Sequence, residues 1–254
     1  MTDRVLEAVR DGRVTMQNVS AAEVLRFRAA TEGGFDRLNR GRAVIDRTED
    51  LDQYLWSYGK MVAAQWAGVL EFGLLQQLPF DRFGLTDVGC GQGLSTTLFL
   101  DHMKGLVAPE RDIADVVSRV RLYDASRLAL RRAREVAALY RLPVSAHEVV
   151  LPLIAHPATP PGESGRVTIL SNILDIEGFD LELLRLQLFV PGGRHLVVAV
   201  SNNRNVAGSG ARVHAFRALL ERHHRVLASE EKAWEVEMVT RTTDVVAFAC
   251  LMES

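Results

Sequence analysis

The sequence predicts an α/β fold in which a parallel sheet follows an N-terminal helical cap. From about residue 83 onward, short apolar runs alternate with segments of helical periodicity, a pattern typical of parallel sheets. Residues 1–80 show helical periodicity without a strand signal. A glycine-rich stretch at residues 89–93 joins the first apolar run to the next helical segment. We therefore expect a helical cap over residues 1–80 and an α/β domain over residues 81–254.

The composition and charge of the chain disfavour several classes of function. The chain has 254 residues, 48% of them hydrophobic, and a net charge of −2, so no bulk positive field favours nucleic acid or an anionic membrane. The two cysteines, Cys90 and Cys250, have no metal-ligand spacing, and we expect both to be reduced in a cytoplasmic protein. No apolar stretch reaches 18 residues, and the first residues lack a signal-peptide core. We expect no metal and no membrane partner.

The cap is expected to contain two helical regions. Gly33-Gly34 breaks the first region, and a polar connection runs from there to about residue 47. The second region covers residues 48–78 and carries Tyr54 and Tyr58, four positions apart and so on one helix face. These tyrosines either close over a ligand or pack the cap against the core.

From about residue 83 onward, predicted strands alternate with predicted helices. Their bounds follow from hydrophobic periodicity and from the positions of turn residues. The expected strands cover 84–88, 120–124, 144–150, 167–171 and 195–200, and two final β runs cover 234–241 and 244–252. The expected helices cover 94–104, 126–140, a stretch beginning near Gly178, and 211–223.

The loop after the first strand has a specific spacing. A dinucleotide fingerprint, G-x-G-x-x-G, would need glycine at position 94, which is Leu94. The sequence reads D-x-G-x-G-x-G instead, beginning at Asp87 and ending at Gly93. This spacing resembles motif I of the class I S-adenosylmethionine-dependent methyltransferases, in which the loop approaches the amino-acid part of the cofactor. Pro-Gly-Gly at 191–193 is similar to that family's turn before its fifth strand.

The resemblance covers about residues 83–252 and implies a fold. It implies a Rossmann-like, seven-stranded methyltransferase sheet with helices on both faces, here preceded by the helical cap. In that family the last strand inserts antiparallel between its neighbours. The resemblance also implies S-adenosylmethionine as the cofactor.

Asp124 ends the second predicted strand and is the family's ribose-binding acid by resemblance. An ionised carboxylate accepts strong hydrogen bonds from ribose hydroxyls. The alternative is an N-cap for the helix at Ser126. Asp124 lies farther from Gly89 than the roughly 20 residues usual for such an acid. The excess fits a surface insertion around residues 107–119.

Two further loop residues have open roles. Asp87 either acts through its carboxylate, close to the cofactor's ammonium group or to the loop N–H groups, or only stabilises the loop. Cys90 is interpreted as a small loop residue, because no basic partner that would activate a thiol is adjacent. The complete expected cofactor set is Asp87, Gly89, Cys90, Gly91, Gly93, Asp124, Ala125, Val150, Leu151, Ser171, Asn172, Tyr54 and Tyr58.

Asn172 and Asp175 follow the fourth predicted strand, where ligands bind at the carboxyl ends of parallel strands. Together with Tyr58 they are the expected catalytic residues, although Asp175 is alternatively a cap for the next helix. Ile173 and Leu174 replace the two prolines of the family's base-amine methylases, so that subclass is disfavoured. Residues 201–205, rich in asparagine, are expected at the same edge as substrate contacts or as a turn.

The sequence therefore predicts methyl transfer to a small-molecule or peptide acceptor. Nucleic acid is not favoured, because the arginines of helix 126–140 lack interleaved aromatics and read as a solvated face. Three alternatives stay open: an RNA or protein methyltransferase, a non-methylating enzyme using the same cofactor, and a non-catalytic binding or assembly protein on this scaffold. The acceptor atom and the oligomeric state are not fixed by the sequence.

Overall fold

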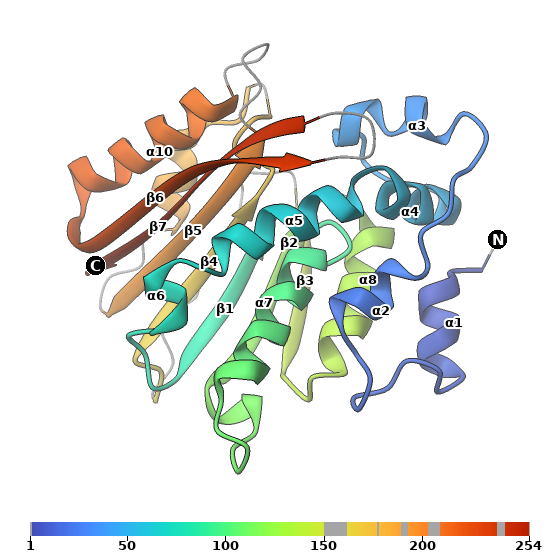
Figure 1. Ribbon diagram of the computed structural model, residues 1–254, viewed down its shortest axis with the longest axis horizontal. Coiled ribbons are helices and arrows are strands. Elements are labelled where there is room, and N and C mark those ends of the chain that lie inside the picture. The colour runs from blue at the N-terminus through green and yellow to red at the C-terminus, as the bar shows by residue number, and fades with distance from the viewer. Residues whose placement is uncertain are drawn as a thin grey trace.

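A seven-stranded sheet with helices on both faces forms the centre of the molecule (Figure 1). The computed structural model describes residues 2–149, 162–176, 178–188, 193–202, 209–237 and 242–253. The strands are β1 (Phe83–Val88), β2 (Val117–Asp124), β3 (Val144–Glu148), β4 (Gly165–Ser171), β5 (Arg194–Asn202), β6 (Arg225–Glu237) and β7 (Thr242–Glu253). Their order is β3-β2-β1-β4-β5-β7-β6. The neighbours among β1–β5 pair in parallel, whereas β7 is antiparallel to both β5 and β6. The expected sheet with an inserted antiparallel strand is confirmed.

Six α-helices of the described chain precede β1 and four lie after it. They are α1 (Arg4–Arg10), α2 (Ala21–Leu25), α3 (Gly34–Arg37), α4 (Thr48–Tyr54), α5 (Lys60–Val69), α6 (Gly73–Gln76), α7 (Leu94–Leu106), α8 (Arg127–Ala138), α9 (Leu181–Leu188) and α10 (Ser209–His223). A π-helical turn, Leu55–Gly59, connects α4 to α5. None of the described helices has the length and hydrophobicity needed to span a bilayer.

Alternate residues of the central strands enter two different cores. Leu85 of β1 packs with the side chains of the cap, α7 and α8, whereas Val88 packs with α9 and α10. This is expected because successive side chains of a strand point to opposite faces. Figure 1 shows α5, α7 and α8 on the face of the sheet turned toward the viewer.

Helix α5 fixes the cap to the sheet. Trp66 is fully buried in the core that the cap shares with β1. Gly68 allows close packing, because a Cβ there would lie 2.6 Å from a ring carbon of Trp234 on β6. Glu230 of β6 accepts hydrogen bonds from the backbone N–H groups of Gly73 and Leu74, at 2.9 and 2.6 Å. The cap is thus attached to the far edge of the sheet as well as to its centre.

Three element boundaries differ from the sequence prediction. β6 begins at Arg225 rather than near 234, because an edge strand tolerates charged residues such as those at 230–232. β2 begins at Val117, so the surface insertion is shorter than expected, with exposed residues at 108–112. α9 begins at Leu181, after Asp180, whose side chain accepts from the N–H of Leu183. The division of the chain at residue 80 stays a prediction.

Candidate functional site

The glycine-rich loop between β1 and α7 has three glycines in the left-handed backbone conformation, and Gly91 and Gly93 differ in what surrounds them. Gly89, Gly91 and Gly93 have φ angles of 71°, 51° and 77°. A Cβ on Gly93 would lie 2.9 Å from the Cβ of Ala133, so this glycine lets α7 approach α8. A Cβ on Gly91 would meet nothing within 4 Å. The loop therefore packs tightly at its end and is open at its middle.

Asp124, at the end of β2, is bonded to this loop. Its Oδ2 accepts the backbone N–H of Gly91 at 2.9 Å, and its Oδ1 accepts that of Ser126 at 2.8 Å. Burial raises the pKa of Asp124, and these backbone N–H groups oppose the shift. The helix cap is Ser126, whose Oγ accepts from the N–H of Ala129 at 3.1 Å. A carboxylate has about four acceptor positions, so Asp124 retains capacity for further donors.

The side chains of Asp87 and Cys90 are buried and do not line the pocket. The Oδ2 of Asp87 accepts the hydroxyls of Ser95 and Thr96, at 2.7 and 2.6 Å, and no described residue is bonded to its buried Oδ1. Burial raises the pKa of Asp87 to about 6. Burial, followed by the charges of Asp124 and Asp87, raises the pKa of Cys90 well above that of an ordinary thiol. Neither thiolate chemistry nor ligand contact is indicated for Cys90.

An amide cluster joins the ends of β4 and β5 to the cap. Gln65 of α5 is fully buried; its Nε2 donates to the Oδ1 atoms of Asn172 and Asn202, at 3.1 and 2.9 Å. Asn172 returns a bond from its Nδ2 to Gln65, at 2.8 Å, and holds a left-handed φ of 56°. The indole N–H of Trp66 donates to the Oγ of Ser171 at 3.2 Å. These hydrogen bonds thus hold the carboxyl ends of β4 and β5 against α5.

Tyr54 and Tyr58 occupy different depths of the cap. Tyr54 lines the pocket, and its pKa is raised by burial and then by the charge of Asp124. The ring of Tyr58 lies 5.1 Å from that of Tyr54 and 6.4 Å from that of Phe35. Tyr54 immediately precedes the π-helical turn and Tyr58 lies within it; such turns are frequent at functional sites.

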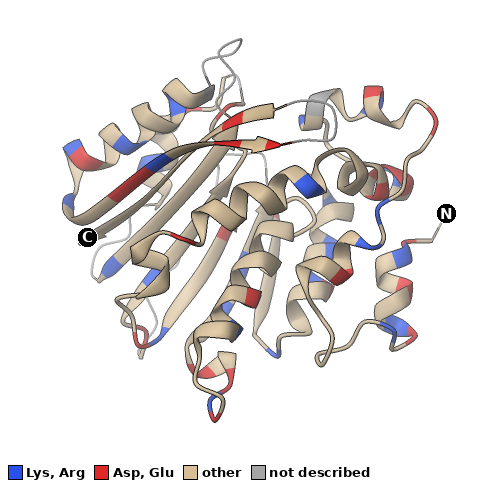
Figure 2. Ribbon diagram, in the orientation of Figure 1, with Lys and Arg blue, Asp and Glu red and all other residues tan. Residues whose placement is uncertain are grey.

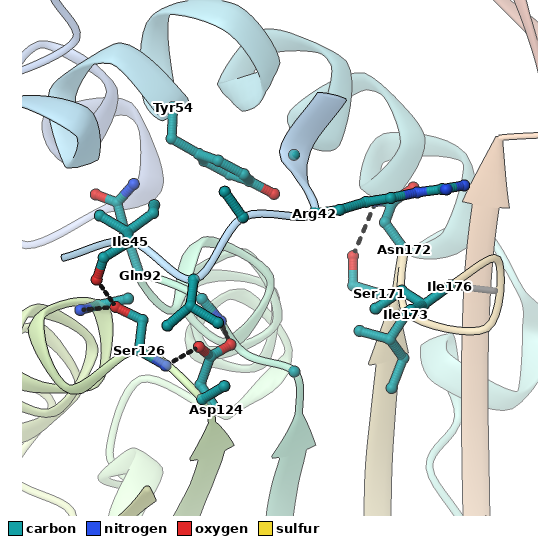
Figure 3. Close-up of a pocket in the computed structure, with 17 residues that line it drawn as sticks. Arg42, Ile45, Tyr54, Gln92, Asp124, Ser126, Ser171, Asn172, Ile173 and Ile176 are labelled. Carbon is teal, nitrogen blue, oxygen red and sulfur yellow. Dashed lines mark hydrogen bonds between the residues drawn. The ribbon is translucent and has the colours of Figure 1, made fainter. Parts of the chain in front are cut away.

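The pocket lies between the loop, the end of β2 and the end of β4. Figure 3 shows Asp124 and Ser126 on one side and Ser171, Asn172 and Ile173 on the other. The pocket brings together some of the expected site residues, namely Gly89, Gly91, Asp124, Ala125, Ser171, Asn172 and Tyr54. Asp87, Cys90, Gly93, Asp175 and Tyr58 do not line it. Val150 and Leu151 lie outside the described residues.

The segment 41–45 crosses this pocket and was not expected there. Ser126 Oγ donates to the carbonyl oxygen of Ile45 at 2.6 Å (Figure 3). Arg42 Nη2 donates to the carbonyl oxygen of Asp175 at 3.4 Å. With the segment in this position the pocket volume is about 140 Å³, below the roughly 300–1,000 Å³ usual for ligand sites. The other lining residues that the sequence did not predict are Gln92, Ser126, Ala129, Ile173 and Ile176.

Gln92 links the loop to a buried ion-pair network. Its Oε1 accepts from Arg132 of α8 at 2.7 Å, and its Nε2 donates to the carbonyl of Leu51 at 2.8 Å. Arg132 is fully buried and pairs with Asp3 and Asp52 at 2.8 and 2.9 Å. The interpretation of this arginine as part of a solvated face is therefore wrong, because carboxylates from α4 and the N-terminal segment neutralise it.

The strand order and the antiparallel β7 between β5 and β6 match the arrangement that the resemblance implies. In fold, the chain resembles the class I methyltransferases. No protein-family model matches the chain, and no curated protein matches its sequence.

Several solved structures are similar. An rRNA methylase from Streptococcus thermophilus is 12% identical, with 73% of this chain and 96% of that chain covered and a TM-score of 0.43. The N-methyltransferase NodS from Bradyrhizobium japonicum is 13% identical, with 72% and 93% covered and a TM-score of 0.44. The ribosomal protein L11 methylase from Lactobacillus delbrueckii is 12% identical, with 77% and 80% covered and a TM-score of 0.38. Likenesses at this level say nothing about cofactor or acceptor.

Proposed function

We propose that the chain transfers a methyl group from S-adenosylmethionine to a small-molecule or peptide acceptor. The observation that carries the proposal is the bond between Gly91 N–H and the Asp124 carboxylate, which sets an open loop and an acid beside one pocket. Such a loop and such an acid, at the carboxyl ends of adjacent parallel strands, are suited to a nucleoside with a charged tail.

The residues present fit such a cofactor chemically. The open side of Gly91 leaves room for a ligand against the backbone, and Asp124 keeps acceptor positions for ribose hydroxyls. Ala129, Ile45 and Ile176 supply apolar walls for a base. The volume admits only part of the molecule while segment 41–45 stays in place, so binding the whole cofactor requires this segment to shift outward.

When bound, the sulfonium cofactor supplies a methyl group for an in-line displacement with a neutral leaving group. The chain's task is then to position donor and acceptor and to exclude water. Asp124 would orient the ribose, and Asn172 would present its amide to the acceptor at the opposite wall. A general base is needed only where the acceptor is protonated at neutral pH. Asp175 is the proposed candidate, although it does not line the pocket while segment 41–45 is in place, so this role would require the segment to shift.

Tyr58 is proposed to act through Tyr54, against which its ring packs. Tyr54 would cover the pocket from the cap side, because it contributes to the lining and responds to the charge of Asp124. A net charge of −2, with basic residues interspersed among acidic ones (Figure 2), supports a small or peptidic acceptor over nucleic acid.

The test is a screen with methyl-labelled cofactor against small molecules, peptides, proteins and RNA, with formation of S-adenosylhomocysteine measured in parallel. We expect label in the small-molecule or peptide fraction, and its loss in Asp124→Ala. Label in RNA or protein would favour those acceptors instead. Binding of S-adenosylhomocysteine without any turnover would favour a non-catalytic scaffold.

A further inference from the structure

A second pocket lies between the carboxyl-terminal ends of α7 and α8, away from the pocket beside Asp124. Its volume is about 250 Å³, just below the range usual for ligand sites, and the two pockets share no lining residue. Ala129 lines the first pocket and Leu139 the second, roughly 15 Å apart along the helix axis. Figure 1 shows the loop that follows α7 at the lower edge of the view. The two pockets therefore lie at opposite ends of α8.

The second pocket is lined mainly by apolar side chains. Ile113 and Tyr140 are buried, with 7% and 4% of their surface exposed. The hydroxyl of Tyr140 donates to the Oδ1 of Asp101 at 2.5 Å, so it is already committed within the protein. The other apolar residues that line the pocket are Met16, Val107, Ala108, Pro109 and Leu139. A ligand in this pocket would therefore contact hydrocarbon.

Three cations from three different elements line the same pocket. Lys104 lies in the last turn of α7, Arg111 in the loop that follows, and Arg141 just after α8. All three residues are exposed. None of them forms an ion pair with a carboxylate in the part of the chain that the structure describes. The rim of the pocket is thus positively charged.

The contacts that these cations do make are weak. The Nζ of Lys104 lies 5.4 Å from the centre of the Tyr140 ring, an exposed cation–π contact. The Nε of Arg141 donates to the thioether sulfur of Met16 at 3.0 Å, and a thioether is a weak acceptor. The guanidinium of Arg111 has no partner among the described residues. Most N–H donors of the three side chains are therefore available to a ligand.

Neighbouring charges offset this positive charge only in part. Among the described residues that line the pocket, Asp112 is the one acid, and its Oδ1 accepts from the N–H of Ala114 at 3.1 Å. Lys104 and Arg141 lie near helix ends that carry about half a negative charge each. Arg111 lies outside both helices, so the helix dipoles do not account for it. Three cations against one carboxylate and two helix ends leave about one positive charge in excess.

We propose that this pocket binds a small organic oxyanion, a carboxylate or a phosphate monoester that carries an apolar body. Guanidinium and ammonium groups form charge-assisted hydrogen bonds with either oxyanion. The apolar lining suits the body of the ligand, and the volume of about 250 Å³ limits it to a small molecule. Binding here requires neither the pocket beside Asp124 nor a methyl donor.

The test compares thermal unfolding of the full chain in benzoate, in phenyl phosphate and in chloride at equal ionic strength. We expect benzoate or phenyl phosphate, at about 10 mM, to raise the Tm saturably by about 2–4 °C, because a ligand that binds only the folded state stabilises it. A rise with both ligands assigns the site to the oxyanion that they share, and a rise with one assigns it to that group. Inorganic phosphate and neutral benzyl alcohol, which each lack one part, should give a much smaller rise.

Substitutions at exposed positions locate the site without disturbing the core. Lys104→Gln and Arg111→Gln should each weaken binding about threefold, and the double variant should abolish the rise in Tm. Arg10→Gln is the matched control, because Arg10 is also an exposed cation in the last turn of a helix, α1, and does not line this pocket. Asp124→Ala should also keep the rise, since Asp124 lines only the other pocket.

Four results would overturn the proposal. The first is equal Tm values in chloride and in both ligands, and the second is an unchanged rise in the double variant. The third is an equal rise with benzyl alcohol, which would show that binding does not need the charge. The fourth is loss of the rise in Asp124→Ala, which would place the ligand in the other pocket.

Discussion

The backbone N–H of Gly91 donates to the Oδ2 of Asp124 at 2.9 Å, across 33 positions of sequence. This bond couples the shape of the glycine-rich loop to the end of β2. Substitutions at either residue should therefore change ligand binding more than they change folding.

Gly91→Ala should weaken binding of S-adenosylhomocysteine by about tenfold or more, because the added methyl group enters the open side of the loop. Gly12→Ala is a matched control: its φ of 70° carries similar strain, about 1–2 kcal/mol, and its Cβ would also meet nothing within 4 Å. Calorimetry and urea unfolding should show equal destabilisation but an affinity loss only in Gly91→Ala. Equal affinities would remove the loop from the site.

Asp87 should make stability fall as the pH rises from about 4 to about 6. Its pKa in the folded state, about 6, exceeds the ordinary aspartate value of 3.8, so the folded state binds the extra proton in this window. The contribution is present below pH 4 and is lost through pH 6, amounting to roughly 3 kcal/mol. Urea unfolding of wild type and Asp87→Asn across pH 4–7 checks this, since the difference between the two curves isolates Asp87. If the difference in unfolding free energy between wild type and Asp87→Asn does not vary with pH, the raised pKa of Asp87 is contradicted.

Tyr54→Phe should leave the Tm unchanged and weaken cofactor binding or turnover by about five- to tenfold, as expected for one lost hydrogen bond. Tyr58→Phe should behave like wild type, while Tyr58→Ala should lower the Tm because its ring packs against Tyr54 and Phe35. The reverse pattern, with Tyr58→Phe impaired and Tyr54→Phe normal, would move the functional hydroxyl to Tyr58.

Arg132→Met should cost about 3–5 kcal/mol of unfolding free energy, because the buried Asp3 would lose this ion pair and Asp52 would keep only its ion pair with the exposed Arg4, at 3.6 Å. It should also weaken ligand binding, since Gln92 loses the partner that fixes its side chain. Arg134→Met, on the exposed face of the same helix, should change stability by no more than about 0.5 kcal/mol. Similar losses in the two variants would show that the network contributes little.

The sequence predicts the parts of the site that depend on local patterns. The strand, glycine loop and helix around Gly91 follow from spacing, and the acid at Asp124 follows from the end of the next strand. The sheet order follows from the family resemblance. These features need no knowledge of distant contacts.

Contacts between distant segments explain what the sequence does not predict. Segment 41–45 has no periodicity of its own, and it is held over the pocket by the bond from Ser126 to the carbonyl of Ile45, 81 positions away. Arg132 belongs to an arginine-rich helix, and only Asp3, 129 positions away, and Asp52 explain its burial. Gln65 reaches Asn202 across 137 positions. Such partners become visible only in the fold.

The most direct test of the account is a calorimetric titration of S-adenosylhomocysteine into wild type, Asp124→Ala and the exposed control Glu71→Ala, with NADH as an alternative ligand. We expect saturable one-to-one binding to wild type and Glu71→Ala. Asp124→Ala should lose roughly 2–4 kcal/mol of binding free energy, about 30-fold or more in affinity, because two charge-assisted hydrogen bonds disappear. Equal affinity in Asp124→Ala, or saturable binding of NADH with none of S-adenosylhomocysteine, would contradict the assignment of this pocket.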